Sequence, residues 1–437
     1  MEKIDNRKWW VQLDIDWKWA FKRAMRRFFN INIKVEPSNN DLEQIIKFLQ
    51  QDLDCSSNQL CDLEPLNTWT NLQYLNCSDN KINDLEALRA LTKLQKLACS
   101  KNSISNLEPL QALTNLQILD CSWNKKIGDL EPLSSLTKLQ ILDCSRNKVI
   151  NLEPLRTLKN LQKLDCYDND ISDLKPLRTL TNLQKLDCHY NQISDLESLH
   201  ALTNLQSLDC NTNEISNLEA IRALTNLQTL DCNTNEIRDL EPLRALINLQ
   251  ELDCRYNQIS DLEPLRTLTN LQKLDCRYNQ ISDLESLRAL TKLQKLDFCH
   301  NKISDLEPLH ALTNLNLQAL DCSTNEISNL GSLSALTNLQ TLNCSSNKIS
   351  NLEPLRTLTN LQTLDCSSNK ISNLEPLHTL TNLQTLNCSF NKISNLEPLH
   401  SLTSLQTLVC MLCKISNLEL EKFKKAVPNC KIILKLF

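Results

Sequence analysis

The segment LQTLDCSSNKISNLEPLHTLTN, residues 361–382, is repeated with few changes along most of the chain. Its ninth residue is asparagine in sixteen successive copies, spaced by 22 residues except for one step of 23 and one of 24. Such a period is typical of a solenoid, in which stacked units bury one continuous core. The repeated asparagines are Asn58, Asn80, Asn102, Asn124, Asn147, Asn169, Asn191, Asn213, Asn235, Asn257, Asn279, Asn301, Asn325, Asn347, Asn369 and Asn391, and a seventeenth copy has Cys413 there.

Two shorter periods within the segment indicate two kinds of element. Leu364 and Cys366 alternate with polar residues, which predicts a short strand with leucine and cysteine facing inward. From residue 374 to residue 380 leucine recurs at every third residue, which suits a tight helical turn on the return leg. Pro376 fits the first turn of such a helix, where its missing N–H would have no partner. The asparagine amide is predicted to satisfy backbone groups of the buried turn.

The pattern LxxLxLxxNxI of residues 361–371 resembles the leucine-rich repeat. The 22-residue units resemble those of a protein phosphatase regulatory subunit of eukaryotes and of bacterial internalins. The cysteine at position 366 and the tryptophan-rich start are similar to repeat proteins of giant amoebal viruses. The resemblance implies an α/β solenoid, a right-handed superhelix of about 17 repeats with a parallel β-sheet on the concave face and short helical or 3-10 turns on the convex face. It also implies a non-catalytic scaffold that binds a partner protein on the concave face.

The two ends differ from the repeats in composition. Residues 1–50 are predicted to form an N-terminal helical cap, with helices over 14–29 and 41–50, because a solenoid must shield its terminal core from water. Residues 51–418 form the solenoid and residues 419–437 a C-terminal cap. In an alternative interpretation, the basic, Trp-rich helix over 14–29 anchors a membrane-peripheral or structural protein.

Several classes of function are disfavoured. Only two glycines occur, so no phosphate-binding loop is expected, and no base–nucleophile pair, metal constellation or cofactor motif indicates an enzyme. A net charge of -5 disfavours nucleic acid as the partner. No signal-like or transmembrane run occurs, and twenty cysteines suit a reducing compartment, so we expect a cytoplasmic protein, or host-cytoplasmic if it is viral. We expect no cofactor and no structural metal, and the sequence leaves the oligomeric state open.

An acidic spine is expected along the concave face. Aspartates recur at the strand position of Asp365, where stacked carboxylates repel by roughly 1 kcal/mol per neighbour. We expect the spine to attract a basic partner surface or loosely held cations, although a tolerated product of repeat duplication is the alternative. Equal spacing is expected to give no single aspartate an unusual pKa. The central members are Asp187, Asp209, Asp231, Asp253 and Asp275.

Large side chains mark the expected docking positions on the concave face. Sixteen copies have cysteine at the repeat position of Cys366, which we call the ladder cysteine, and we call the repeated asparagine the ladder asparagine. Most residues between the two are small, as in Ser367 and Ser368. Aromatic residues and arginine are enriched at interface hot spots, so their presence here predicts partner contacts, with drift among repeats as the alternative. We expect one group around Tyr190 and another around Tyr278, with Trp123 standing alone. The predicted residues are Trp123, Tyr167, His189, Tyr190, Arg255, Tyr256, Arg277, Tyr278 and His300.

Overall fold

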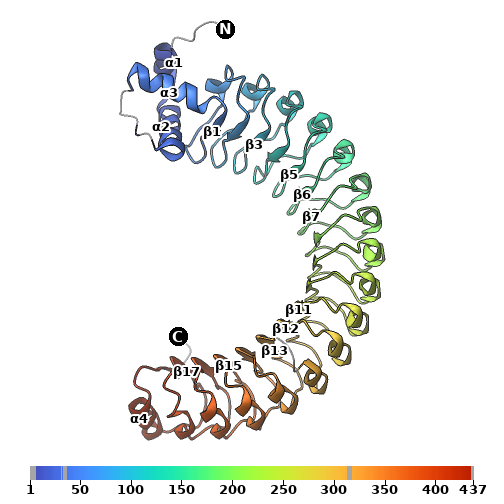
Figure 1. Cartoon of the computed structure of the whole chain (residues 1–437), viewed down its shortest axis with the longest axis vertical. Helices are drawn as coiled ribbons and strands as arrows, with labels where there is room; N and C mark the ends of the chain where they lie inside the picture. Colours follow the sequence, from blue (N-terminus) through green and yellow to red (C-terminus); the bar gives the residue numbers. More distant parts are fainter. Residues whose placement is uncertain (1–5, 31, 33–36, 313–316, 435–437) are drawn as a thin grey trace. The chain divides into compact units, whose positions relative to one another are not determined.

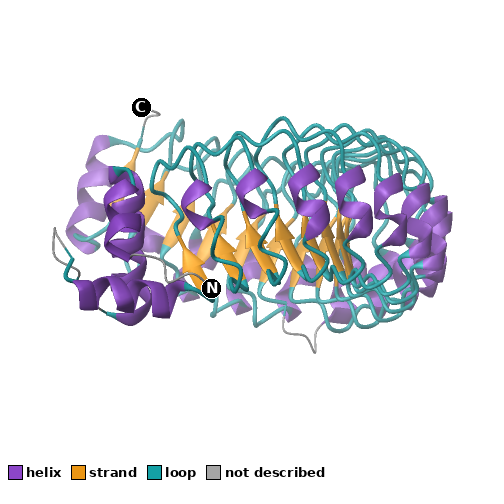
Figure 2. Ribbon diagram, turned by 90° about the horizontal axis from the view of Figure 1, so that it is seen from above, coloured by secondary structure: helices purple, strands orange, loops and turns teal. Residues whose placement is uncertain are grey.

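The computed structural model describes residues 6–30, 32, 37–312 and 317–434. These residues fall into two compact units, Met1–Glu214 and Ile215–Phe437. In each unit the strands lie on the inner side of the curve and the short helices on the outer side (Figure 1). We call the strand side of each unit its inner face. Neighbouring strands lie side by side, and a loop leaves each of them (Figure 2).

The first unit begins with α-helices and continues with parallel strands. The helices are α1 (Asn6–Gln12), α2 (Ile15–Phe29) and α3 (Asn39–Leu49). The strands are β1 (Asp52–Asp54), β2 (Tyr74–Asn76), β3 (Lys96–Ala98), β4 (Ile118–Asp120), β5 (Ile141–Asp143), β6 (Lys163–Asp165), β7 (Lys185–Asp187) and β8 (Ser207–Asp209). The 3-10 helices are η1 (Glu64–Leu66), η2 (Glu86–Leu88), η3 (Glu108–Ala112), η4 (Glu131–Ser135), η5 (Glu153–Thr157), η6 (Lys175–Thr179) and η7 (Glu197–Ala201).

The second unit repeats the strand and 3-10 helix pattern and ends with an α-helix and a last strand. Its strands are β9 (Thr229–Asp231), β10 (Glu251–Asp253), β11 (Lys273–Asp275), β12 (Lys295–Asp297), β13 (Ala319–Asp321), β14 (Thr341–Asn343), β15 (Thr363–Asp365), β16 (Thr385–Asn387), β17 (Thr407–Val409) and β18 (Lys431–Ile433). Its helices are η8 (Glu219–Ala223), η9 (Glu241–Ala245), η10 (Glu263–Thr267), η11 (Glu285–Ala289), η12 (Glu307–Leu312), η13 (Gly331–Ala335), η14 (Glu353–Thr357), η15 (Glu375–Thr379), η16 (Glu397–Leu399) and α4 (Asn417–Ala426).

The strands of each unit are parallel and in register from one repeat to the next. Leu252, for example, pairs with Leu274, one repeat later. The central strand residue is buried throughout the repeats, and the sixteen ladder cysteines are each at most 2% exposed. Desolvation raises the pKa of a thiol such as Cys188 well above its ordinary value, so these side chains behave as small apolar groups. The predicted solenoid and its inward leucine and cysteine are therefore confirmed.

The asparagine ladder is structural, as predicted. The Asn391 amide donates to the carbonyl oxygens of Cys388 at 3.1 Å and of Cys366, in the preceding repeat, at 3.0 Å. Its Oδ1 accepts the backbone N–H of Ile371 at 2.9 Å. One side chain thus joins two repeats at groups that a buried turn would otherwise leave unpaired. In the last copy the Cys413 thiol donates to the Cys388 carbonyl at 3.3 Å and so replaces one of the hydrogen bonds of the asparagine amide.

The return leg is a 3-10 helix in the sixteen copies that carry the asparagine, as its three-residue leucine period predicted, whereas the α-helix α4 follows the last copy. In η15, the Glu375 N–H donates to Asn373 Oδ1 at 2.9 Å, which satisfies a free donor at the start of the helix. Pro376 and Leu377 follow and are buried.

The N-terminal helices pack on the first repeat. Helices α2 and α3 match the two that were expected, whereas α1 was not foreseen. Phe21 stacks on Trp69 of the first repeat at 5.2 Å between ring centroids, and Trp10 and Trp17 are each 1% exposed. Arg27 forms an ion pair with Asp54, at the end of β1, at 2.6 Å. Some of the basic and aromatic side chains of this segment therefore pack against the repeats.

The C-terminal segment packs on the last repeat. Phe423 of α4 is buried, and β18 pairs in parallel with β17. Among the described residues, no helix has both the length and the apolar character needed to cross a bilayer.

Candidate partner-binding surface

The large side chains of the inner face lie in the turn that follows each strand. The residue before each ladder asparagine has a left-handed backbone, with φ of 56° at Trp123, 51° at Tyr256 and 55° at Ser368. This conformation costs a non-glycine residue about 1 kcal/mol. Serine or threonine fills the position in several repeats, so the fold itself does not require a ring there.

A first aromatic cluster, in the first unit, comprises Trp123, Arg146, Tyr167, His189 and Tyr190. The Arg146 guanidinium carbon lies 3.9 Å from the Trp123 ring centroid and 5.5 Å from that of Tyr167. Tyr167 stacks on His189 at 4.3 Å, with 7° between the ring planes, and Tyr190 meets His189 edge-on at 5.4 Å. The expectation that Trp123 stands alone is therefore wrong. Arg146 was missed, although it occupies the same repeat position as Trp123 one copy later.

A second aromatic cluster, in the second unit, comprises Tyr256, Tyr278 and His300. Tyr256 stacks on Tyr278 at 4.2 Å, and Tyr278 stacks on His300 at 4.0 Å, with planes within 12° of parallel. Both tyrosines reach solvent, Tyr256 being 47% and Tyr278 37% exposed. Three consecutive repeats thus present one continuous ring stack.

The predicted arginines of the second unit pair with aspartates. Arg255 Nε lies 3.2 Å from Asp253 Oδ2, and Arg277 Nη2 lies 3.1 Å from Asp275 Oδ2. Each guanidinium also approaches the aspartate of the following repeat, at 3.9 Å for Arg255 and 3.5 Å for Arg277. The two arginines therefore neutralise part of the acidic spine.

The spine aspartates also accept hydrogen bonds within the turns that follow their strands. Asp209 Oδ1, in the first unit, accepts the N–H of Asn211 at 3.2 Å and its side-chain amide at 2.7 Å. Asp231, in the second unit, makes the same pair of bonds to Asn233, at 3.1 Å and 2.6 Å. Within the second unit, Asp231, Asp253 and Asp275 face one another in register along the sheet. The row thus has a structural role besides its charge.

Burial gives some of these carboxyls unusual pKa values. The expectation that no single aspartate of the equally spaced row has an unusual pKa is therefore wrong. Desolvation, then the charges of Asp231 and Asp275, raises the pKa of Asp253 to about 7. Desolvation, then the charge of Asp297, raises the pKa of Asp275 to about 6. The spine therefore carries less negative charge near neutral pH than a count of its residues implies.

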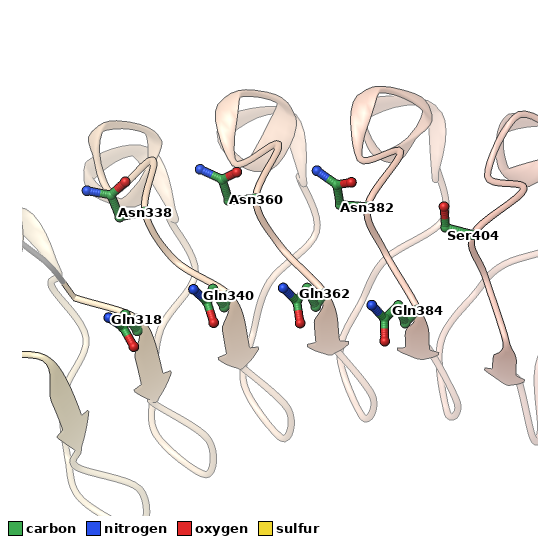
Figure 3. Close-up of a pocket in the computed structure, with 8 residues that line it drawn as sticks. All are labelled: Gln318, Asn338, Gln340, Asn360, Gln362, Asn382, Gln384 and Ser404. Carbon is green, nitrogen blue, oxygen red and sulfur yellow. The ribbon is translucent and has the colours of Figure 1, made fainter.

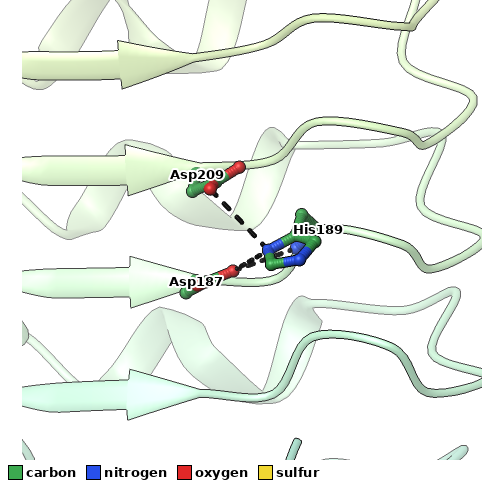
Figure 4. A group of neighbouring side chains, drawn as sticks. All are labelled: Asp187, His189 and Asp209. Carbon is green, nitrogen blue, oxygen red and sulfur yellow. Dashed lines mark hydrogen bonds and ion pairs between the residues drawn. The ribbon is translucent and has the colours of Figure 1, made fainter. Parts of the chain in front are cut away.

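Two groups of side chains have the composition of metal ligands among the described residues. Asp187, His189 and Asp209 form one, and Asp297, Cys299 and Asp321 form the other. His189 Nδ1 lies 2.5 Å from Asp187 Oδ1 and 3.7 Å from Asp209 Oδ2 (Figure 4). Cys299 is only 7% exposed, and burial raises the pKa of its thiol.

A polar groove that the sequence analysis did not foresee lies in the second unit. It has a volume of about 460 Å³ and runs between one row of glutamines and one row of mostly asparagines (Figure 3). Asn360 and Asn382 donate to backbone carbonyls of their preceding repeats, at 3.0 Å and 2.9 Å, so this asparagine row also braces the stack. The lining residues are Gln318, Asn338, Gln340, Asn360, Gln362, Asn382, Gln384 and Ser404.

Comparison with known proteins adds a family and a set of similar folds. The family described as Leucine Rich repeats (2 copies) matches in overlapping segments over residues 70–245 and 291–377, and also over 247–289 and 381–422. No curated protein matches the chain.

The similar solved structures include three bacterial repeat proteins. A leucine-rich-repeat protein of Leptospira interrogans is 28% identical, with a TM-score of 0.76, over 80% of this chain and 92% of that one. The functional domain of InlJ from Listeria monocytogenes, described as including a cysteine ladder, is 25% identical, with a TM-score of 0.67, over 93% and 82%. An internalin (inlF) from Listeria monocytogenes is 26% identical, with a TM-score of 0.53, over 90% and 94%.

Proposed function

Because the chain belongs to the leucine-rich-repeat family, whose members are generally protein-interaction scaffolds, we propose that it is a non-catalytic scaffold that binds a partner protein on its inner face. The stacked core fixes the side chains of this face before binding, so little conformational entropy is lost when a partner docks.

The observation that carries this proposal is the exposed ring stack of Tyr256, Tyr278 and His300. The rings occupy a backbone conformation that disfavours large side chains, at a position where the fold accepts threonine, as at Thr234. Stacked tyrosines offer a large, rigid contact area with polar hydroxyl groups at the edge, which is typical of binding hot spots. The first aromatic cluster offers a similar surface in the first unit.

We further propose that the partner presents basic side chains to the acidic spine. Asp187 and Asp209 in the first unit and Asp231 in the second are partly exposed members of this spine. Attraction between exposed charges falls with ionic strength, so the affinity should decrease by more than twofold between low and high salt.

A reducing compartment suits this scaffold, and we propose the cytoplasm, or the host cytoplasm if the protein is viral. The sixteen ladder thiols are buried side by side at successive strands, where they pack as small apolar groups. Titration of thiols in the unfolded protein, purified without reductant, should return all twenty cysteines.

The test replaces the second aromatic cluster and its arginines by residues that other repeats carry at the same positions. A variant with Arg255→Asn, Tyr256→Thr, Arg277→Asn and Tyr278→Thr keeps the repeat pattern of Asn233 and Thr234. A control variant carries Glu241→Ala, Arg244→Ala, Glu263→Ala and Arg266→Ala in the same repeats, on the outer side.

Both variants and the wild type are used for affinity capture with quantitative mass spectrometry, followed by direct titration of the captured protein. We expect the inner-face variant to lose at least tenfold in affinity, because several hot-spot side chains are removed together. The control should bind like the wild type. Equal binding by all three proteins would refute the inner face as the docking surface.

A further inference from the structure

Three donor atoms converge at the ends of β7 and β8, within the first unit. They belong to Asp187, His189 and Asp209, and all lie within 4.8 Å of one another (Figure 4). The three side chains are between 19% and 31% exposed, so the group is half-buried but open to ions from solvent. One nitrogen and two carboxylate oxygens are a donor set that divalent transition metals accept.

In the second unit, a positively charged side chain lies between two successive spine aspartates. There, Arg255 lies between Asp253 and Asp275 and brings a permanent positive charge to both carboxylates. His189 occupies the same repeat position between Asp187 and Asp209. A metal ion held between His189 and the two carboxylates would bring positive charge to this place in the same way.

The spacing of the donor atoms suits a metal ion. An ion about 2.0 to 2.2 Å from each donor keeps those donors about 3.0 to 3.5 Å apart. The Nδ1 of His189 is 2.5 Å from one carboxylate oxygen and 3.7 Å from the other, so the observed distances lie on either side of this range. Small side-chain rotations on Asp187 and Asp209 would bring both oxygens to coordinating distance.

The imidazole is also held in place by its neighbours. Tyr167 stacks on the ring of His189 at 4.3 Å and restricts its rotation. The backbone N–H of His189 donates to Asp187 Oδ1 at 3.3 Å, which fixes the turn that carries the ring. Support of this kind lowers the cost of ordering a ligand when the metal binds.

We propose that Asp187, His189 and Asp209 bind one divalent transition-metal ion of the zinc(II) or cobalt(II) type. The ligands are His189 Nδ1 and one oxygen of each carboxylate. Three protein ligands leave at least one coordination position for water or for a donor group from another molecule. The site shares His189 with the first aromatic cluster.

The experiment titrates the full chain with cobalt(II), because the visible spectrum of this ion distinguishes nitrogen and oxygen ligands from thiolates. His189→Asn and Asp209→Asn remove one ligand each, and both are substitutions that the repeat tolerates, since Asn211 and Asn343 stand at the same positions in other copies. Cys299→Ser is the matched control, because it disables the other candidate group and places there the residue found at Ser323.

We expect one cobalt ion per wild-type chain, with visible bands of nitrogen and oxygen coordination and no thiolate charge-transfer band. Binding should weaken at least tenfold in His189→Asn and in Asp209→Asn and stay unchanged in Cys299→Ser. Cobalt should also raise the melting temperature of the wild type and of Cys299→Ser, but not that of the two ligand variants. The proposal is overturned if the wild type binds no cobalt at micromolar concentration, if the ligand variants bind as the wild type does, or if the site disappears in Cys299→Ser.

Discussion

Two repeats are longer than 22 residues, and the hydrogen bonds of the ladder asparagine differ between them. In the first unit, the step from Asn124 to Asn147 is 23 residues, and two lysines separate Asn124 from Ile127 where other copies have one residue. Asn147 still donates to the carbonyls of Cys121 and Cys144, at 3.1 Å and 3.0 Å, but its buried Oδ1 has no hydrogen-bond partner among the described residues.

In the second unit, the step from Asn301 to Asn325 is 24 residues, yet the ladder is complete. Ile303 follows Asn301 at the usual distance of two residues, and its N–H donates to Asn325 Oδ1 at 2.9 Å. The extra residues of this repeat fall around residues 313–316, outside the described part of the chain. The hydrogen bonds of the asparagine ladder therefore depend on the number of residues between asparagine and isoleucine within the turn more than on the total length of the repeat.

The largest expected effect compares alanine substitutions of the two asparagines. Asn325→Ala leaves the Ile303 N–H without its acceptor and removes the bonds to Phe298 and Cys322, so we expect a loss of about 3 to 5 kcal/mol. Asn147→Ala removes an oxygen that is already unpaired, so its loss should be about 1 to 3 kcal/mol smaller. Urea unfolding of both variants measures this difference, and equal losses would mean that the unpaired oxygen costs nothing.

Restoring the 22-residue step should stabilise the first unit. Deletion of Lys126 gives the order asparagine, lysine, isoleucine found at Asn301 and brings the Ile127 N–H within reach of Asn147 Oδ1. We expect a gain of about 1 to 3 kcal/mol from the newly satisfied oxygen. Slower hydrogen exchange of the Ile127 amide should accompany the gain.

Lys126→Ala is the control for the deletion, because it removes the same charge and keeps the 23-residue step. If the deletion variant and Lys126→Ala have the same stability, the length of the turn is not what leaves Asn147 unpaired.

The sequence predicts the fold well because the positions that decide it are buried and repeated. Leu364, Cys366 and Asn369 each have one stable orientation in a parallel stack, and every other copy imposes the same choice. The helix α1 escaped prediction because its seven residues have neither an acidic first turn nor a basic last turn, and it gains its order from packing against α3.

The surface was less predictable, because contacts on the inner face depend on side-chain reach across repeats. The register places Arg146 next to Trp123, yet only the structure shows that its guanidinium lies over both Trp123 and Tyr167. The raised pKa of Asp253 likewise depends on how far the turn buries its carboxyl, which equal spacing alone does not indicate.

A pH effect should follow from Asp143, which lies in the repeat of Asn147. Desolvation, then the charges of Asp120 and Asp165, raises the pKa of Asp143 to about 6, from an unfolded value of 3.8. The folded chain therefore holds this proton more tightly, and the associated stability is present below pH 4 and is lost as the pH rises through 6.

Asp143→Asn should remove this dependence. The asparagine oxygen can accept the bonds that Ser145 now donates to the carboxylate, as Asn343 does from Ser345. We expect the variant to match the wild type at pH 4 and to be more stable by about 1 to 2 kcal/mol at pH 8, allowing for solvent screening. Unfolding at the two pH values measures this, and a difference that does not change with pH would show that Asp143 titrates normally.

The smallest expected effect concerns the backbone of the two long repeats. The turn after Asn124 holds Lys125 at a left-handed φ of 61°, whereas Lys302, its counterpart after Asn301, is not left-handed. Asparagine tolerates this conformation better than lysine, because its short polar side chain can bond locally. Lys125→Asn should therefore stabilise the chain by about 0.5 kcal/mol, while Lys302→Asn should give no gain. If both substitutions shift the urea midpoint equally, the left-handed conformation of Lys125 does not destabilise the chain. The unpaired oxygen of Asn147 would then account for all the stability lost through the longer turn.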